Sequence, residues 1–90
     1  MPTVKFTYAL KRFFPGLKDT PAKGIILAEI LDEMEASYPG INNYILDEQG
    51  NLRRHVNIFI NGTMIADRTK LSGPVSEKSE IYIIQALSGG

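Results

Sequence analysis

The chain ends in "QALSGG", and its last residues carry the clearest chemical signal in the sequence. The reactive group at this end is the α-carboxylate of Gly90, which is inert toward nucleophiles at neutral pH. It reacts only after activation, most simply as an acyl-adenylate made with ATP. Gly89 and Gly90 have no Cβ, so they can thread a narrow channel. We therefore expect residues 87–90 to form a flexible tail, with Ser88 and Gly89 threading and Gly90 reacting.

The interior offers little that resembles a catalytic or metal site. The chain has no cysteine, so disulfides, thiolate zinc ligands and thiol nucleophiles are excluded. His55 is the only histidine, and beside Arg53 and Arg54 it is more typical of a surface residue than of a ligand or base. Glu29 and Glu33 are neighbours on a predicted helix, where such charges usually only contact solvent. We predict no catalytic residue, no bound cofactor and no metal ligand.

The bulk composition limits the possible function classes. Ninety residues indicate one domain spanning 1–90. The formal net charge of +0 argues against a nucleic-acid partner, which usually selects a basic excess. No apolar run approaches the roughly 20 residues of a membrane span, and the first residues do not follow a signal-peptide pattern. We expect a cytoplasmic protein with neither a membrane nor a nucleic acid as partner.

The tail must be positioned by the elements that precede it. Residues 3–10 alternate in polarity, with Val4, Phe6 and Tyr8 on one side, which predicts a strand. After a turn at Pro15-Gly16, residues 17–22 form a short, weaker strand pattern.

The next apolar residues recur at the helix period. This pattern predicts a helix over residues 26–38, stopped by Pro39-Gly40. Residues 42–51 are predicted to form a loop with a turn at Gln49-Gly50-Asn51.

The second half of the chain predicts three further strands. Residues 56–60 alternate and are followed by Asn61-Gly62, which favours a type I′ hairpin turn with a return strand over 63–66. Residues 80–87 form the last strand. The order β-β-α-β-β-β predicts an α+β fold, the β-grasp or ubiquitin-like roll. It has a mixed sheet of about five strands, one main helix on one face, and the two terminal strands parallel at its centre.

One face of this sheet is expected to remain uncovered. If Ile58, Ile60, Ile81 and Ile83 point into the core, then Phe59, Tyr82 and Ile84 point away from it. Exposed large apolar side chains on a small domain indicate an interface. The alternative is that some of them fill a small second core.

Three segments, "EASYPGI", "LRRHVNIFING" and "EIYIIQALSGG", closely resemble the sulfur-carrier branch of the ubiquitin-like superfamily. This branch includes the small subunit of molybdopterin synthase and the thiamine-pathway and cysteine-pathway carriers, and "RRHVNIFIN" is most similar to the cysteine type. The resemblance implies that a ubiquitin-activating-type enzyme uses ATP and Mg²⁺ to adenylate Gly90. A sulfur donor then leaves a thiocarboxylate, which a biosynthetic enzyme consumes. The protein is thus a carrier and a substrate, not an enzyme.

The resemblance also implies partner contacts. Ile84 and Met64 match positions that contact the adenylating enzyme; Phe59 is added from the strand alternation and Arg54 as a polar contact at the rim. The sequence departs from the family in having "SEKSE" before the last strand and Gln85 where proline is common, which puts the partner's identity in doubt but not the tail chemistry.

Two other functions share these sequence features. A protein modifier uses the same adenylation but ends as an isopeptide on a lysine. A non-covalent β-grasp interaction domain would not need Gly89 and Gly90 at all. The receiving pathway, the oligomeric state and whether Gly90 is exposed by processing remain open from the sequence.

Overall fold

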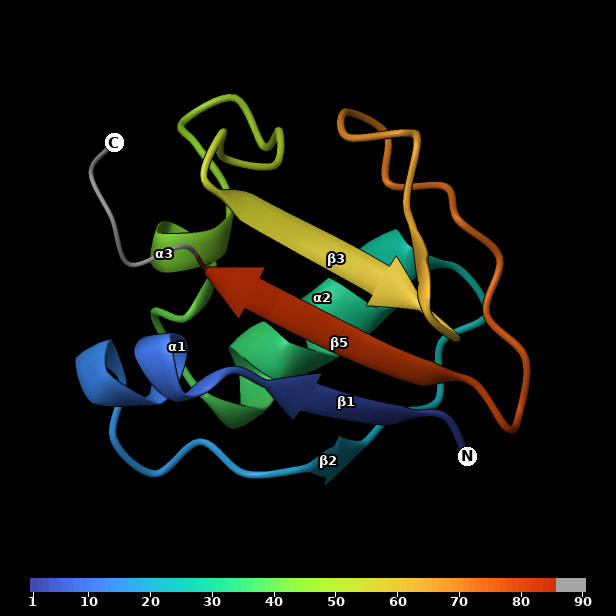
Figure 1. The fold of residues 1–90 in the computed structure, drawn as a ribbon, viewed down its shortest axis with the longest axis horizontal. Helices are drawn as coiled ribbons and strands as arrows, with labels where there is room; N and C mark the ends of the chain where they lie inside the picture. The colour runs from blue at the N-terminus through green and yellow to red at the C-terminus, as the bar shows by residue number, and fades with distance from the viewer. Residues whose placement is uncertain (86–90) are drawn as a thin grey trace.

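The computed structural model describes residues 1–85. Its elements in chain order are β1 (Thr3–Phe6), α1 (Tyr8–Phe13), β2 (Thr20–Pro21), α2 (Leu27–Ser37), α3 (Asn42–Ile45), β3 (Val56–Ile60), β4 (Thr63–Met64) and β5 (Glu80–Gln85). The strands form one sheet in the order β2-β1-β5-β3-β4 (Figure 1). The predicted tail over 87–90, and the part of the predicted last strand beyond Gln85, lie outside the described residues.

The two terminal strands lie side by side at the centre of the sheet. β1 and β5 are parallel, whereas the β1–β2, β3–β5 and β3–β4 pairs are antiparallel. Figure 1 shows α2 crossing behind the sheet and covering one of its faces. This confirms the predicted β-grasp, with one main helix on a mixed five-stranded sheet.

The hydrophobic core lies between α2 and the covered face of the sheet. Alternate residues of the central strands are buried, as are the apolar residues at helical spacing along α2: Val4, Phe6, Val56, Ile58, Ile81, Ile83, Leu27, Ile30, Leu31 and Met34. Full burial of one such aliphatic side chain is worth about 1.5–3 kcal/mol. Because strand side chains alternate, the same register leaves the other face of the sheet free of this core.

The predicted strand over 3–10 is wrong beyond Phe6, because α1 begins at Tyr8. The Thr7 amide still bonds the Ile83 carbonyl, and the Lys11 amide then donates to the Thr7 carbonyl at 3.2 Å, which starts the helix. In this helix Ala9 and Leu10 are buried together, whereas Tyr8 is 76% exposed instead of lying beside Val4 and Phe6. Burial of two adjacent apolar residues favours a helix over a period-two strand at this position.

The predicted loop over 42–51 is also partly wrong, since it begins with the short helix α3. Glu35 of α2 fixes this helix: its carboxylate accepts the amides of Gly40 at 2.7 Å and Asn42 at 3.0 Å. These two backbone hydrogen bonds lower the pKa of the Glu35 carboxyl. Ile45 is then fully buried, which anchors α3 to the core.

The remaining boundaries differ from the prediction mainly in strand length. β2 covers only Thr20–Pro21 of the predicted 17–22, and β4 only Thr63–Met64 of the predicted 63–66. The predicted hairpin turn is confirmed, because Asn61 and Gly62 both have positive φ, 52° and 83°.

Gly24 gives a direct test of how tightly the segment before α2 packs. A Cβ at this position would lie 2.7 Å from the Glu29 Cβ and 3.1 Å from the Ile30 amide nitrogen. The Glu33 carboxylate also accepts the amides of Lys23 and Gly24, both at 2.7 Å. We expect Gly24→Ala to lower the free energy of unfolding by about 1–3 kcal/mol, measured by urea denaturation. The exposed neighbour variant Lys23→Ala should unfold like the wild type, and equal midpoints for both variants would contradict the close approach.

Candidate partner-binding site

Gly90, which is predicted to react, and Ser88 and Gly89, which are predicted to thread, lie outside the described residues, whereas the strand that leads to them is described up to Gln85. β5 occupies the middle of the sheet and its last residue, Gln85, is paired with Val56 of β3. On the other side the Gln85 amide donates to the Thr7 hydroxyl at 3.4 Å. Gln85, the last described residue, is therefore held on one side by β3 and on the other by the residue that follows β1.

The uncovered face of the sheet carries an apolar hollow of about 280 Å³. Phe59, Tyr82 and Ile84 line it together with Gly62 and Glu80. Tyr82 is 42% exposed, whereas Phe59 and Ile84 are half-buried. The strand alternation thus brings together the three side chains that the sequence predicted for this face.

Strands β4, β3, β5 and β1 each contribute one residue to a row that crosses the uncovered face of the sheet. Met64 of β4 lies opposite Phe59, Phe59 opposite Tyr82, and Tyr82 opposite Lys5 of β1. Residues directly opposite each other share a face, with their Cβ atoms about 4.5–5.5 Å apart. We call Met64, Phe59, Tyr82 and Lys5 the open-face row. Met64, a predicted interface residue at the outer end of this row, is 52% exposed and lines a separate hollow with Ile65 and Pro74.

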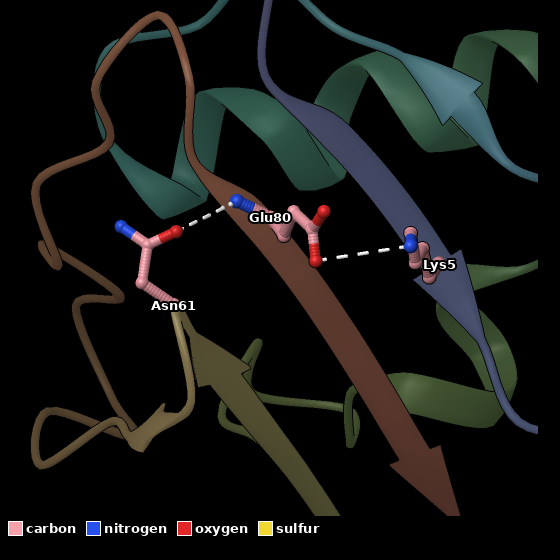
Figure 2. A network of polar contacts seen from close by, with 3 residues as sticks. All are labelled: Lys5, Asn61 and Glu80. Carbon is pink, nitrogen blue, oxygen red and sulfur yellow. Dashed lines mark hydrogen bonds and ion pairs between the residues drawn. The ribbon is translucent and has the colours of Figure 1, made fainter.

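A polar network borders the hollow at the start of β5 (Figure 2). Asn61 accepts the Glu80 amide through its side-chain oxygen at 2.9 Å and donates its own amide to the Glu80 carbonyl at 2.9 Å. The Glu80 carboxylate lies 3.7 Å from the Lys5 ammonium. This exposed ion pair stabilises the fold by at most about 1 kcal/mol. It places charged groups at the edge of the apolar hollow. The two hydrogen bonds of Asn61 hold the hairpin turn against β5.

The structure places Arg54 at the same end of β3 as Ile84 but apart from the predicted interface residues Phe59 and Met64. Arg54 is exposed and precedes β3 at the end that pairs with Gln85, whereas Met64 follows the opposite end of β3. Arg54 does not line the hollow. Its predicted contact at the rim therefore belongs to the end of the sheet where the tail begins.

The acidic residues of α2 have a structural task that the sequence did not reveal. The Glu29 carboxylate accepts the Ile25 amide at 2.9 Å, and Glu33 accepts two further amides of the same segment. The prediction that Glu29 and Glu33 only contact solvent is therefore wrong. Both carboxylates hold the segment that leads into α2. His55 is exposed, and residues 1–85 hold no group of three or more His, Cys, Asp or Glu residues arranged to bind a metal ion.

Two residues of the connection after β4 were not predicted to matter. The Arg68 guanidinium donates to the Asn57 side-chain oxygen at 2.9 Å and to the carbonyls of Arg53 and Val56 at 2.6 and 2.7 Å. It thereby fixes the start of β3. Asp67 accepts the Lys70 and Ser72 amides and the Ser72 hydroxyl, which hold the pKa of its carboxyl well below the usual range. The only sequence signal is an Asp followed by Thr and Ser at turn spacing.

The sheet order, the parallel central strands and the single covering helix define a β-grasp protein of the ubiquitin-like type. A family model, the ThiS family, matches residues 4–90, and the chain belongs to this family. In the part of the chain that the structure describes, no helix is long and apolar enough to cross a membrane.

Proteins similar to this chain are known both as sequences and as structures. The sulfur carrier protein CysO of Mycobacterium bovis is 29% identical over 90 residues, covering 98% of this chain and 97% of CysO. The structure of the Amycolatopsis orientalis BexX/CysO complex matches with a TM-score of 0.84 and 27% identity over all of both chains. Small archaeal modifier protein 1 of Methanosarcina acetivorans matches with a TM-score of 0.78 and 27% identity, covering 99% of this chain and 95% of that one. The family and the CysO relatives confirm the predicted function of a sulfur carrier.

Proposed function

We propose that this protein carries sulfur as a thiocarboxylate on Gly90. The observation that carries the proposal is the placement of β5: a central strand ends at Gln85, five residues before Gly90, on a sheet whose open face carries an apolar hollow. The likeness to proteins named sulfur carriers supports it. The folded domain is the part that partner enzymes bind, and the chemistry takes place on the tail in the active sites of those enzymes.

The proposed loading has two balanced steps. First, a Gly90 carboxylate oxygen attacks the α-phosphorus of ATP, and the bond to pyrophosphate breaks, which gives an acyl-adenylate. Second, the sulfur of a hydrosulfide-level donor attacks the acyl carbon, the bond to AMP breaks, and the S–H proton passes to solvent. No oxidant or reductant is needed. The ATP and Mg²⁺ act in the partner, and this chain supplies only the carboxylate.

In this scheme the protein is a substrate of a ubiquitin-activating-type enzyme rather than an enzyme itself. We propose that this partner binds the open-face row and its hollow, where Phe59, Tyr82 and Ile84 offer apolar area without a charge at the centre. That a CysO relative forms a complex with BexX supports the use of a protein partner. A biosynthetic enzyme of the cysteine, molybdopterin or thiamine type then takes the sulfur.

One observation favours a second candidate function. The similarity to small archaeal modifier protein 1 is at the same identity as that to the solved CysO structure, 27%. A modifier would pass the activated Gly90 carbonyl to a lysine and form an isopeptide. The two functions differ in the fate of the tail, a small thiocarboxylate or a large conjugate.

ATP dependence distinguishes loading from adventitious sulfur binding. The purified protein, incubated with an extract of its host, ATP and ³⁵S-labelled sulfide, should gain label that survives gel filtration. Omission of ATP should remove at least about nine-tenths of the label, because an unactivated carboxylate does not react. Equal labelling without ATP would contradict the proposed adenylation.

A further inference from the structure

A second surface with a different chemistry lies at the end of the sheet where the tail begins. It is formed by α1, α3 and the residues before β3, which Figure 1 shows gathered at the end toward which β5 runs. We call it the tail-root surface and define it by Tyr8, Arg12, Phe13, Tyr44, Arg53 and Arg54. It is distinct from the open-face row, which crosses the middle of the sheet.

Aromatic rings form the centre of the tail-root surface. Phe13 of α1 stacks on Tyr44 of α3, with ring centroids 6.3 Å apart and an interplanar angle of 23°. Phe14 meets the same Tyr44 ring edge to face at 6.0 Å. Yet Phe13 and Tyr44 remain 53% and 37% exposed, so the stacked pair is packed without being covered, and Tyr8 of α1 is 76% exposed. Exposed large apolar side chains held in place by packing are typical of binding surfaces.

Positive charge surrounds these rings. The tail-root surface holds Arg12, Arg53 and Arg54, which are three of the four arginines in a chain of formal net charge +0. The Arg53 side chain donates to the Asn43 carbonyl at 3.1 Å, which ties the residues before β3 to α3. Neither α1, α3 nor residues 53–55 contain an acidic residue.

The nearest acidic residues in sequence do not neutralise this surface as a whole. Asp47 and Glu48 follow α3 and line a hollow with Arg53. The Asp47 carboxylate is engaged by the amides of Gln49 and Asn51, at 2.9 and 3.0 Å. The side chains of Arg12 and Arg54 make no hydrogen bond or ion pair within residues 1–85, and both residues are exposed.

We propose that the tail-root surface is the docking site of the enzyme that removes the sulfur, a protein whose own surface is acidic around an apolar pocket. Arginine and aromatic residues are the types most enriched at interface hot spots, and the cationic rim selects a partner of opposite charge. The open face, by contrast, carries an apolar hollow, to which the proposed function assigns loading. This inference rests on the proposed function, since it assigns the second enzyme of that scheme to a second surface.

The test is the thiocarboxylate fraction of the protein in its host, with the chromosomal copy replaced by Arg12→Glu/Phe13→Ser. Loading should persist and unloading should fail. The fraction that carries sulfur should therefore rise, and its decay after sulfur supply is withdrawn should slow about tenfold. Arg12→Glu alone, which keeps the aromatic cluster, should shift the fraction in the same direction but less. Arg12→Lys should behave as the wild type.

A matched control lies at the opposite end of the molecule. Lys23→Glu/Ile25→Ser makes the same charge change and also removes an exposed apolar side chain, since Ile25 is 70% exposed. It should leave the thiocarboxylate fraction unchanged. Intact mass measures the fraction in each strain, and circular dichroism of the purified variants checks the fold.

The other outcomes overturn the inference. A lower thiocarboxylate fraction in Arg12→Glu/Phe13→Ser would assign the tail-root surface to loading. An unchanged fraction would remove any docking role for it. If the wild type itself never carries sulfur, the proposed function fails, and that failure is seen in the wild-type sample independently of the variants.

Discussion

Deletion of Gly89 and Gly90 is expected to abolish sulfur loading while leaving the fold intact. The reacting carboxylate would move to Ser88, which is two residues closer to the sheet and has a side chain. The free energy of unfolding should change by less than about 0.5 kcal/mol, because the buried core described here ends with β5. Loading is measured as ATP-dependent ³⁵S incorporation, and stability by urea denaturation.

Single substitutions in the tail distinguish the effect of tail length on sulfur loading from the effect of an added side chain. Gly90→Ala keeps a carboxylate at the same chain position but adds a Cβ, so loading should fall strongly, by about tenfold or more. Ser88→Ala changes no backbone freedom and should load nearly as well as the wild type. Normal loading of the chain that lacks Gly89 and Gly90 would contradict the proposed role of Gly90 and favour a non-covalent interaction domain.

Tyr82→Glu is expected to produce the second large effect, a loss of adenylation without loss of folding. Tyr82 lies between Phe59 and Lys5 in the open-face row and lines the hollow, so a carboxylate there would be buried by an apolar partner. A hot-spot loss of at least about 2 kcal/mol corresponds to roughly 30-fold weaker binding. The measurement is the KM of the adenylating enzyme for this protein, by ATP–pyrophosphate exchange.

The control for this prediction is Tyr82→Phe, which keeps the ring and should leave the KM within about threefold of wild type. Because Tyr82 is 42% exposed, both variants should retain the far-UV spectrum of the wild type. Equal KM values for Tyr82→Glu and wild type, with both proteins folded, would show that the adenylating enzyme binds elsewhere.

The central strands of the sheet could be predicted from the sequence because their buried residues alternate over most of their length. Ile58, Ile81 and Ile83 are fully buried, as the alternation requires, whereas Ile60, which was also predicted to point into the core, is half-buried against it. Asn61-Gly62 is a turn signal with a single steric cause. The order of the elements then leaves the β-grasp as the arrangement that buries the helix stripe.

The two short helices could not be predicted in the same way. α1 has six residues and α3 four, which is below the length at which a helix is stable by itself, so tertiary packing decides them. In residues 3–10, Tyr8 continues the strand alternation by chance, and the helix shows only in the exposure of Tyr8 and in the burial of Ala9 beside Leu10.

The residues of the candidate site likewise fall into those that strand periodicity predicts and those that depend on tertiary packing. Phe59, Tyr82 and Ile84 follow from strand periodicity, and Met64 joins them because the hairpin register places it opposite Phe59. Arg68 was missed because it bonds backbone carbonyls of residues more than ten positions away, which leaves no pattern in the sequence. The tail-root surface depends on α1 and α3 and was hidden with them.

The central claim is that Gly90 carries sulfur, and intact mass of the protein from its own host tests it most directly. The sample is prepared under sulfur demand and without reducing or thiol-modifying reagents. We predict a species heavier by the exchange of one oxygen for one sulfur, absent from the chain that lacks Gly89 and Gly90. The free acid alone, with no heavier species, would contradict the claim, and high-mass conjugates in its place would establish the protein as a modifier.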